Sequence, residues 1–374
     1  MKNKILFVRA NSTSPRVIKE ALSLGKQNYD VHLLLWNRID NSSKTYRKEN
    51  ITITEYGFRA PYGNKVIFYW IFWWFEIFRY LLRNDIDIVH VCGLDSYIPV
   101  VFLKQIKKYK VVYDIFDFLG DSLPIGTPNV LRMFVSWFER FLSQFADMVI
   151  IVDECRREQI SNIARSKIEV IMNCVDDRYP KGVEKHLNEQ FTIFYGGMLS
   201  KNRGLYEILA VVQNDPEISL IVAGSGEDEK QLVDALNQGK NITFLGHISH
   251  EEALEYTFRS DVIFAFYNPE IPINRLASPN KLFEAMMCRT PIIVNLETTI
   301  AKTVQEIDCG LVVPYEDKSK LKDAITKLKN NRNLGELMGN NGRIAFETQY
   351  NWKIMEQRLQ GLYSKLCNGR EYRI

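Results

Sequence analysis

The sequence lacks the features that mark several large classes of protein. Its six cysteines are far apart and form no C-x-x-C pair, which argues against a zinc ribbon and a secreted disulfide framework. It contains no G-x-S-x-G, Walker A or H-E-x-x-H motif, so the common hydrolase, kinase and zinc-protease interpretations have no support. The formal net charge is only +3, and no basic block with interleaved aromatics occurs, so we expect no nucleic acid partner.

We also expect no secretory signal at the N-terminus. Its apolar run, Ile5–Val8, is too short for a signal peptide, so we expect a cytoplasmic protein. The long apolar segment Val66–Leu82 is interrupted by Glu76 and Arg79, so we do not expect it to span a bilayer. Two interpretations of it are open. It is either a buried helix, or an aromatic face resting on the membrane, which would make the protein peripheral at the inner face of the cell membrane.

The 374 residues are enough for two domains. Apolar runs of strand length alternate with amphipathic stretches of helix length, the pattern of parallel sheets built from βαβ units. We therefore predict two Rossmann-like α/β domains facing across a cleft, residues 1–178 and 179–352, with a polar linker at 176–189. The expected strands are Ile5–Ala10, Val31–Leu35, Ile51–Thr54, Ile86–Val91, Val111–Ile115, Met148–Val152 and Val170–Met172, then Phe191–Tyr195, Ser219–Ala223, Ile242–Leu245, Val262–Phe266, Ile292–Asn295 and Leu311–Val313.

The clearest candidate site is the segment 276–287, which reads LASPNKLFEAMM. Ser278 is a good N-cap and Pro279 a good first helical residue, so we expect a helix to begin there. Its free N–H groups and positive dipole end would suit a phosphate. Lys281 gains nothing from the dipole in this first turn, but would bind a diphosphate, and Glu284 could accept hydrogen bonds from ribose hydroxyls. The alternative is an exposed ion pair between Lys281 and Glu284.

A second candidate site follows the first strand of the second domain. There Gly196 and Gly197 let the backbone approach a ligand, and Arg203, at the expected start of a helix, can hold phosphate oxygens. Both cations would lie on the same edge of one sheet, so the two sites support each other. Gly224 and His247 follow later strands and either form simple turns or flank the nucleotide base.

In the first domain, Asp114 and Asp117 come at the carboxyl end of a predicted strand, where catalytic or acceptor-binding groups collect. His90 lies within a strand, and a core histidine is the better interpretation of it. The D-x-D sequence at 85–87 opens a strand at the opposite edge of the sheet, so we expect no metal site.

Taken together, these motifs resemble family 4 of the retaining glycosyltransferases. The blocks YGGMLSKNRGL, LIVAGSGE, ITFLGHIS, SPNKLFEAM, PIIV and GLVVP follow that family's order, and PRVIKEALSL, DIVHVCGLDSYIP, VVYDIFDF, ERFLSQFADMVIIVDE and VIMNCVD match more loosely. The resemblance implies a GT-B fold whose terminal helix, 353–374, returns to the first domain. It also implies transfer, with retention, from a nucleoside-diphosphate sugar to a glycan or lipid-linked acceptor in cell-envelope polysaccharide or glycolipid synthesis, without a cofactor or an obligatory metal.

By position, the resemblance assigns Arg203 and Lys281 to the donor diphosphate and Glu284 to the ribose. The two cations would stabilise the negative charge that develops on the leaving diphosphate. The expected catalytic residues are Arg203, Lys281, Asp114 and Asp117. The expected donor-binding residues are Gly196, Gly197, Arg203, Gly224, His247, Ser278, Asn280, Lys281, Leu282 and Glu284.

Three positions depart from the family pattern. Leu276 stands where an acidic residue often contacts the sugar, Met198 where many members carry an arginine, and Phe116 where a histidine often contacts the donor sugar. Asp114 or Asp117 would then substitute for that histidine. These departures leave two alternatives open: a GT-B nucleotide-sugar epimerase, or a non-catalytic scaffold that keeps the fold.

Overall fold

The computed structural model describes residues 2–12, 14–61, 63–123, 126–179, 185, 189–213, 215–236 and 239–368. The chain divides into two compact units, Met1–Met172 with Met355–Ile374, and Asn173–Ile354. The boundary therefore comes slightly before the predicted one at 178/179. Part of the predicted linker, 180–184 and 186–188, lies outside the described residues.

The first unit is built on a sheet of eight strands. They are β1 (Lys4–Arg9), β2 (Asp30–Asn37), β3 (Lys44–Lys48), β4 (Ile51–Gly57), β5 (Ile88–Cys92), β6 (Lys110–Ile115), β7 (Met148–Ile151) and β8 (Ile168–Val170). Their order is β3-β4-β2-β1-β5-β6-β7-β8, and every neighbouring pair is parallel except β3 with β4. The central strands are apolar on both sides because helices cover both faces of the sheet.

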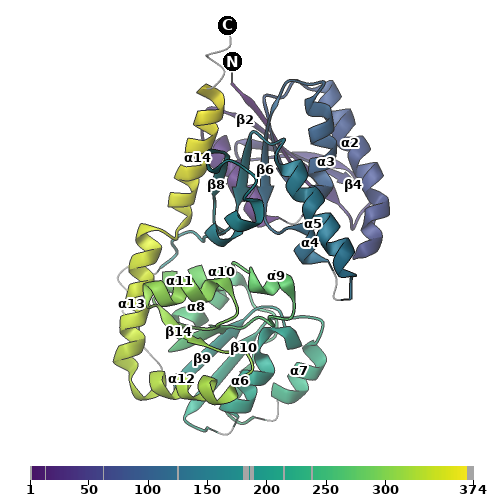
Figure 1. The fold of residues 1–374 in the computed structure, drawn as a ribbon. Coiled ribbons are helices and arrows are strands. Elements are labelled where there is room, and N and C mark those ends of the chain that lie inside the picture. The colour runs from purple at the N-terminus through teal and green to yellow at the C-terminus, as the bar shows by residue number, and fades with distance from the viewer. Residues whose placement is uncertain are drawn as a thin grey trace. The chain divides into compact units, whose positions relative to one another are not determined.

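Helices of the first unit lie on either side of this sheet (Figure 1). They are α1 (Pro15–Gly25), η1 (Asn64–Tyr69), α2 (Trp70–Arg83), α3 (Leu94–Lys104), α4 (Leu119–Ser122), α5 (Asn129–Ser143), η2 (Glu154–Ile160), η3 (Arg165–Lys167) and α14 (Trp352–Asn368). Side chains of α2, α3 and α5 join one core cluster with alternate strand residues. On the other face, the Tyr363 hydroxyl of α14 is 2.8 Å from Nδ1 of His90. The terminal helix thus packs on the first unit, as the resemblance implied.

The apolar segment at 66–82 divides into η1 and α2. Trp73, Ile77 and Leu81 of α2 are buried against the sheet, whereas Phe72 and Phe75 are 59% and 63% exposed. The inner stripe of this segment is therefore core, as the buried-helix interpretation expects, and its outer stripe is exposed. Contact of that outer stripe with a membrane stays a prediction. Among the described residues, no helix is long and apolar enough to cross a membrane.

The second unit has a parallel sheet of six strands. They are β9 (Phe191–Gly196), β10 (Ile218–Ala223), β11 (Ile242–Phe244), β12 (Val262–Ala265), β13 (Ile292–Asn295) and β14 (Gly310–Val313). Their order is β11-β10-β9-β12-β13-β14. The direction in which strands are added reverses between β9 and β12. Ligands of open α/β sheets collect at the carboxyl ends of the strands at such a switch point.

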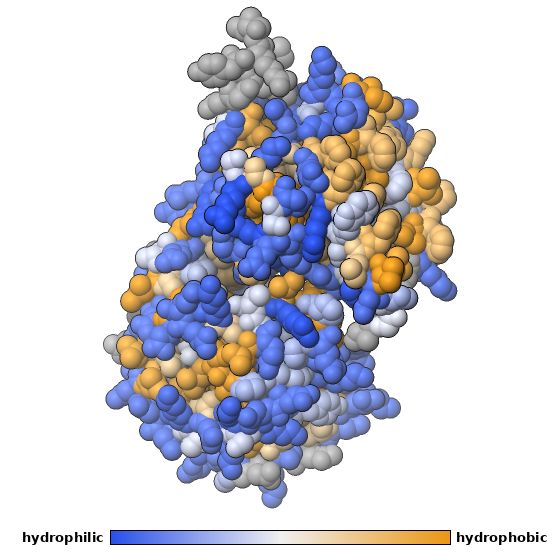
Figure 2. Space-filling view, in the orientation of Figure 1, coloured by the Kyte–Doolittle hydropathy of each residue, from blue (hydrophilic) through white to orange (hydrophobic). Residues whose placement is uncertain are grey.

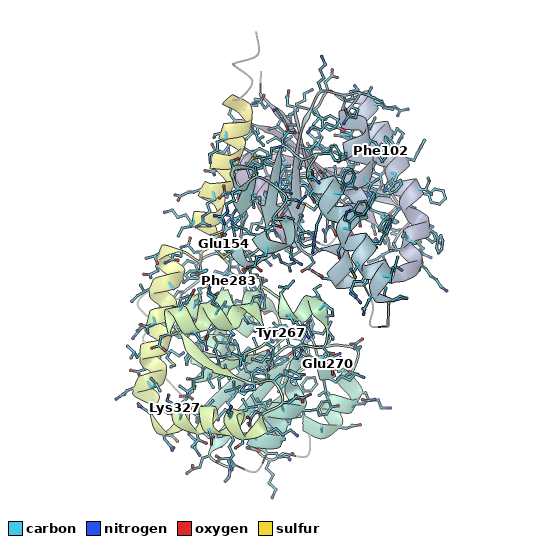
Figure 3. The ribbon with its side chains drawn as sticks, viewed as in Figure 1. Phe102, Glu154, Tyr267, Glu270, Phe283 and Lys327 are labelled. Atoms are coloured by element: carbon cyan, nitrogen blue, oxygen red, sulfur yellow. The ribbon has the colours of Figure 1, made fainter. Side chains whose placement is uncertain are left out.

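Helices again cover both faces of the second sheet. They are η4 (Lys201–Arg203), α6 (Leu205–Val212), α7 (Glu229–Leu236), α8 (His250–Arg259), α9 (Pro272–Arg275), α10 (Asn280–Met287), α11 (Thr299–Ile307), α12 (Lys318–Asn330) and α13 (Arg332–Thr348). Side chains of α6, α7 and α12 form one core with the strands, and α8 and α10 pack on β9 and β12. Figure 3 labels Phe283 of α10, which is buried, and Tyr267, which follows β12.

Candidate functional site

Two glycines shape the switch point of the second sheet. Gly197 has φ +154°, and a Cβ built on it would lie 3.1 Å from Cε and 3.2 Å from Nζ of Lys281. Gly224 has φ +138°, and its Cβ would lie 1.7 Å from the carbonyl oxygen of Gly197. A side chain at either position would be strained, and at Gly224 it would collide with backbone. The glycines therefore allow the turns after β9 and β10 to lie against each other and beside Lys281.

The helix that carries Lys281 begins one residue later than predicted. Pro279 is extended, with φ −76° and ψ 143°, so it is the N-cap and α10 starts at Asn280. The predicted capping role of Ser278 is therefore wrong. Its Oγ is buried and has no hydrogen-bond partner among the described residues. A donor-binding role for this hydroxyl stays a prediction.

Asn280 and Leu282, the other donor-binding candidates on this helix, already have partners. Oδ1 of Asn280 accepts a hydrogen bond of 2.6 Å from the side chain of Asn173. The Leu282 side chain is 2% exposed and belongs to the core, and its N–H donates to the carbonyl of Pro279 at 3.2 Å. Lys281 is thus the side chain that this first turn offers to an anion.

The Lys281 ammonium lies 3.6 Å from the centroid of the Tyr195 ring and forms a cation–π contact with it. Burial lowers the pKa of Lys281 to about 7, and the charge of Arg203 acts in the same direction, whereas Glu284 opposes it. An amine in this state gains a full charge when an anion binds beside it.

Arg203 lies at the end of η4, just before α6, and not in the first turn of a helix as predicted. Gly204 at φ +71° separates the two elements. The guanidinium lies 4.5 Å from the centroid of the Tyr267 ring. Asn268 holds η4 against the end of β12, because its N–H donates to the Asn202 carbonyl at 3.0 Å. The charge of Arg203 also contributes to the lowered pKa of Lys281. That the two cations converge on one diphosphate stays a prediction.

Glu284 has a partner that the sequence did not reveal. Nε2 of His250 lies 2.8 Å from its Oε1, and this hydrogen bond is the main cause of a raised pKa of His250. His250 opens α8 just after Ser249, which forms a capping box with Glu252. No pattern in the sequence connects two residues on different helices in this way. The alternative of an exposed ion pair between Lys281 and Glu284 does not occur among the ion pairs of the described residues, in which Glu284 pairs with His250.

A cavity of about 660 Å³ opens beside these groups. Ligand pockets usually measure roughly 300–1,000 Å³. The predicted residues Gly196, Gly197, Gly224 and His247 all line it, and so does His250. Through Gly197 the cavity borders Lys281, and through His250 it borders Glu284. The structure thus places Lys281 and Glu284 next to residues that line the cavity, whereas Arg203 is not among its lining residues.

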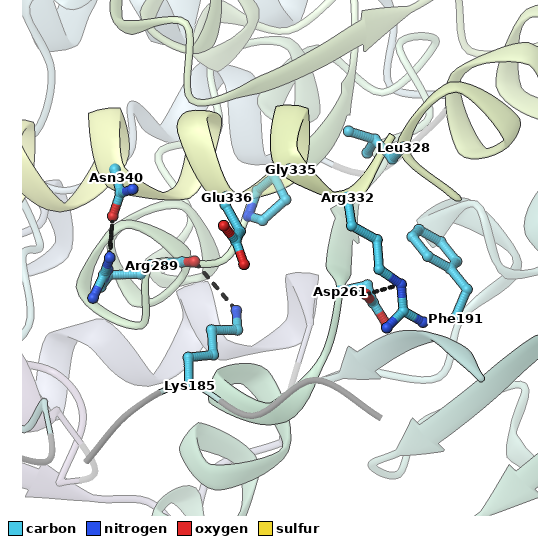
Figure 4. A pocket seen from close by; sticks show the side chains of 10 residues that line it. Lys185, Phe191, Asp261, Arg289, Leu328, Arg332, Gly335, Glu336 and Asn340 are labelled. Carbon is cyan, nitrogen blue, oxygen red and sulfur yellow. Dashed lines mark hydrogen bonds and ion pairs between the residues drawn. The ribbon is translucent and has the colours of Figure 1, made fainter. Parts of the chain in front are cut away.

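A smaller cavity, of about 170 Å³, lies at the opposite edge of the same sheet (Figure 4). Four of its charged residues, Lys185, Asp261, Arg289 and Arg332, already have partners. Arg332 is 3.4 Å from Asp261, Nε of Arg289 donates to Asn340 at 2.9 Å, and Nζ of Lys185 lies 2.7 Å from the Thr290 hydroxyl. These contacts hold the amino ends of the strands together, so we assign this cavity a structural role.

In the first unit, Asp114 is fully buried in the core. Its carboxylate contacts Arg16 at 3.3 Å and Nε2 of His90 at 3.4 Å. His90 is buried as well, as a core histidine should be. His90, Cys92 and Asp114 have ligand atoms close enough to hold a metal, but His90 and Asp114 serve this network instead. The catalytic prediction for Asp114 has no geometric support, because the side chain does not reach the surface.

Asp117 does reach the surface, just beyond β6. Its side chain is 44% exposed and pairs with the buried Arg156 at 2.7 Å. Phe116 beside it is flanked by the guanidinium groups of Arg9 and Arg16, each 4.7 Å from the ring centroid. A catalytic part for Asp117 stays a prediction.

Both halves of the chain match families of known proteins. Residues 181–345 match the family Glycosyl transferases group 1, and residues 16–179 match Glycosyltransferase Family 4. The capsular polysaccharide biosynthesis glycosyltransferase CapM of Staphylococcus aureus is 26% identical over 278 residues, 67% of this chain and 70% of CapM. The phosphatidyl-myo-inositol mannosyltransferase of Mycobacterium leprae is 21% identical over 78% of this chain and 76% of its own length.

A solved structure gives the same fold over nearly the whole length. HepE of Anabaena, crystallised in complex with UDP and glucose, aligns with a TM-score of 0.70 at 12% identity, covering 97% of this chain and 100% of that one. With both family matches and the two parallel-sheet units in place, the chain belongs to the family 4 type of glycosyltransferases with the GT-B fold.

Proposed function

We propose that this enzyme moves a sugar from a nucleoside-diphosphate sugar, linked to UDP or GDP, to a glycan or lipid-linked acceptor in cell-envelope polysaccharide or glycolipid synthesis. The relatives named for capsular polysaccharide and for phosphatidyl-myo-inositol support the acceptor class, and the UDP complex of HepE supports the donor class. The observation that carries the proposal is the Lys281 ammonium, which lies beside Gly197 at the cavity and is influenced by the charge of Arg203. Neither of the two cations forms an ion pair with any described residue, although each is seated on a tyrosine ring.

The two cations have a direct part in the chemistry. Breaking the bond between sugar and phosphate places negative charge on the departing diphosphate, and fixed cations at that position lower the barrier. Metal ions often supply such charge, but here two side chains supply it, so the proposal includes no metal and no cofactor. We propose transfer with retention, by attack on the face of the sugar that the diphosphate leaves. A phosphate oxygen would take the acceptor's proton.

The proposed enzyme works at the inner face of the cell membrane, where a lipid-linked acceptor would be found. The exposed outer stripe of the segment 66–82 supports contact with the membrane. This contact would keep the protein peripheral.

The test of this function is a panel of UDP- and GDP-sugars, each incubated with and without glycan and lipid-linked acceptors and followed by mass spectrometry. We expect sugar transfer from at least one donor, with the donor's anomeric configuration kept in the product. Conversion of the donor sugar without any acceptor would identify an epimerase instead. Failure to bind either UDP or GDP in a calorimeter would identify a non-catalytic scaffold.

Donor binding should depend on pH because Lys281 must be charged to hold phosphate. The pKa of Lys281 is about 7 without ligand, and a bound diphosphate favours the ammonium, so the pKa rises in the complex. Above pH 7 the free protein loses this proton, and UDP affinity should fall by up to about tenfold per pH unit until the pKa of the complex is reached.

Calorimetry between pH 7 and 9, in buffers that differ in ionisation enthalpy, should detect proton uptake on UDP binding. The Lys281→Arg variant, which keeps its charge throughout, should lose this pH dependence. Equal pH dependence in the two proteins would assign the effect to another group, and His250 is then the first to examine.

His250 should act as a positioning residue for Glu284. In the His250→Phe variant, the carboxylate loses the hydrogen bond that holds it, so affinity for UDP should fall by about tenfold. Affinity for 2′,3′-dideoxy-UDP, which has no ribose hydroxyls for Glu284 to bind, should change much less. The matched control is His32→Phe, which removes a histidine of the first unit that also pairs with a carboxylate, Asp30 at 3.4 Å. An equal loss for both ligands would show that His250 acts by another route.

A further inference from the structure

Apolar side chains gather on one side of the first unit, over α2, α3 and α5 (Figure 2). Most of the large hydrophobic residues that are exposed among the described residues belong to these helices and their ends. Phe68, Phe75 and Phe102 are 76%, 63% and 66% exposed, and Met133 and Trp137 of α5 are 70% and 58% exposed. Figure 3 labels Phe102 at this surface. We call this surface the aromatic face.

Helix α5 turns its apolar stripe outward to solvent and not toward the core. The buried residues of α5 are Glu139, Leu142 and Ser143, so the inward surface is short and partly polar. Phe134, Trp137 and Phe141 instead form an outward ladder, with ring centroids 6.0 and 5.8 Å apart in succession. Surface helices normally turn their apolar stripe to the core. An outward stripe of this size marks a site of association.

The three helices form one continuous surface. Helix α3 contacts both α2 and α5, and Nζ of Lys104 on α3 donates to the Phe145 carbonyl, just past α5, at 2.8 Å. The aromatic face is therefore wider than the segment 66–82 that the sequence indicated.

Charges at the border of the aromatic face are mainly positive. Lys65, Arg83, Lys108 and Arg140 are exposed around it, and we call them the basic rim. Among the carboxylates near them, Glu76 is bound to Arg79 and Glu139 is buried, whereas Asp85 is exposed and lies 3.7 Å from Lys107.

We propose that the aromatic face and its basic rim bind an anionic phospholipid bilayer. Phe and Trp rings enter the boundary between headgroups and acyl chains, while Lys and Arg contact the phosphates above. A symmetric contact between two copies would set two identical basic rims against each other, and that repulsion disfavours self-association. The inference rests on the proposed lipid-linked acceptor, because a bilayer contact would place the enzyme where that substrate is found.

The test is sedimentation of the full chain with vesicles of phosphatidylcholine alone, or mixed equally with phosphatidylglycerol, in the absence of any nucleotide sugar. We expect binding to the mixed vesicles, weaker binding to the neutral ones, and a decrease as salt rises. In the Phe134→Ser/Trp137→Ser variant, the partition coefficient between vesicles and solution should fall by about tenfold or more. The Lys108→Gln/Arg140→Gln variant should bind the mixed vesicles only about as strongly as the native protein binds the neutral ones.

The matched control is Leu337→Ser/Ile344→Ser, which removes two exposed apolar side chains of the second unit and should bind vesicles like the native protein. UDP affinity reports whether each variant is folded. Equal vesicle binding by the α5 variant and the control would overturn the proposal, and so would a stable dimer in light scattering that dissociates in the α5 variant. Because Lys281→Ala should bind vesicles normally, failure of the bilayer proposal and failure of the proposed transferase function are distinguishable.

Discussion

Replacement of Lys281 with alanine is expected to lower kcat/KM for sugar transfer by about 10²–10³-fold. The ammonium is the side chain that the first turn of α10 presents next to Gly197, and it would contact the diphosphate as negative charge develops there. Loss of one preorganised charge-stabilising group costs about that much in known active sites. Steady-state kinetics with the best donor of the panel would measure it.

The variant should nevertheless fold normally. A partly buried amine whose pKa is lowered by burial is a cost to the native state, not a support for it. We therefore expect the Tm of Lys281→Ala to equal or exceed that of the native protein. The matched control is Lys302→Ala, because Lys302 is exposed and pairs only with Glu306 in the described structure. Equal activity of both variants would remove Lys281 from the mechanism.

Arg203→Ala should cause a loss of similar size, about 10²-fold in kcat/KM, and Arg203→Lys should recover only part of it. A guanidinium offers two parallel N–H groups to a phosphate and stacks flat on an aromatic ring, which an ammonium cannot do. In the structure the Arg203 guanidinium carbon lies 4.5 Å from the centroid of the Tyr267 ring. Arg259→Ala, which removes an exposed arginine paired with Glu255, is the matched control.

The two cations should act as a unit. Because they share one proposed ligand, the effects of Arg203→Ala and Lys281→Ala should not multiply in the double variant. A double variant that loses the full product of the two single losses would indicate that the cations act at separate places.

Most of the architecture could be predicted because buried parallel strands leave a strong pattern. Uninterrupted apolar runs of four residues, such as 148–151 and 262–265, are typical of strands that are covered on both faces of a sheet. The strand β3 was missed because it lacks this apolar pattern. Its five residues, Lys44–Lys48, are all exposed, and it pairs with β4 at the edge of the sheet, so no apolar periodicity marks it.

The candidate site could be predicted only as far as local signals extend. Glycine turns and a lysine in a first helical turn are local, and they indicated Gly197, Gly224 and Lys281. The contact of His250 with Glu284 joins two helices, and nothing in either helix alone indicates it. The burial of Asp114 depends on α1 and α14 covering that face of the sheet, which the position of the residue at a strand end does not disclose.

The outward aromatic stripe of α5 was also missed. A hydrophobic stripe at helical spacing is the usual mark of a core helix, and the sequence alone does not say which way it turns. In the structure, Glu139 accepts hydrogen bonds from the Tyr113 hydroxyl and the Leu119 N–H. These bonds hold the polar side of α5 toward the core. The functional interest of α5 therefore depends on the packing of the first unit.

The central claim is that Arg203 and Lys281 hold the same pyrophosphate. A crystal structure of the native protein with UDP or GDP tests it most directly. We expect diphosphate oxygens within about 3.2 Å of both the guanidinium and the ammonium, with the ammonium drawn away from the Tyr195 ring. The account would be contradicted by a bound nucleotide whose diphosphate contacts neither group, with Arg203 still on the Tyr267 ring and Lys281 still on the Tyr195 ring.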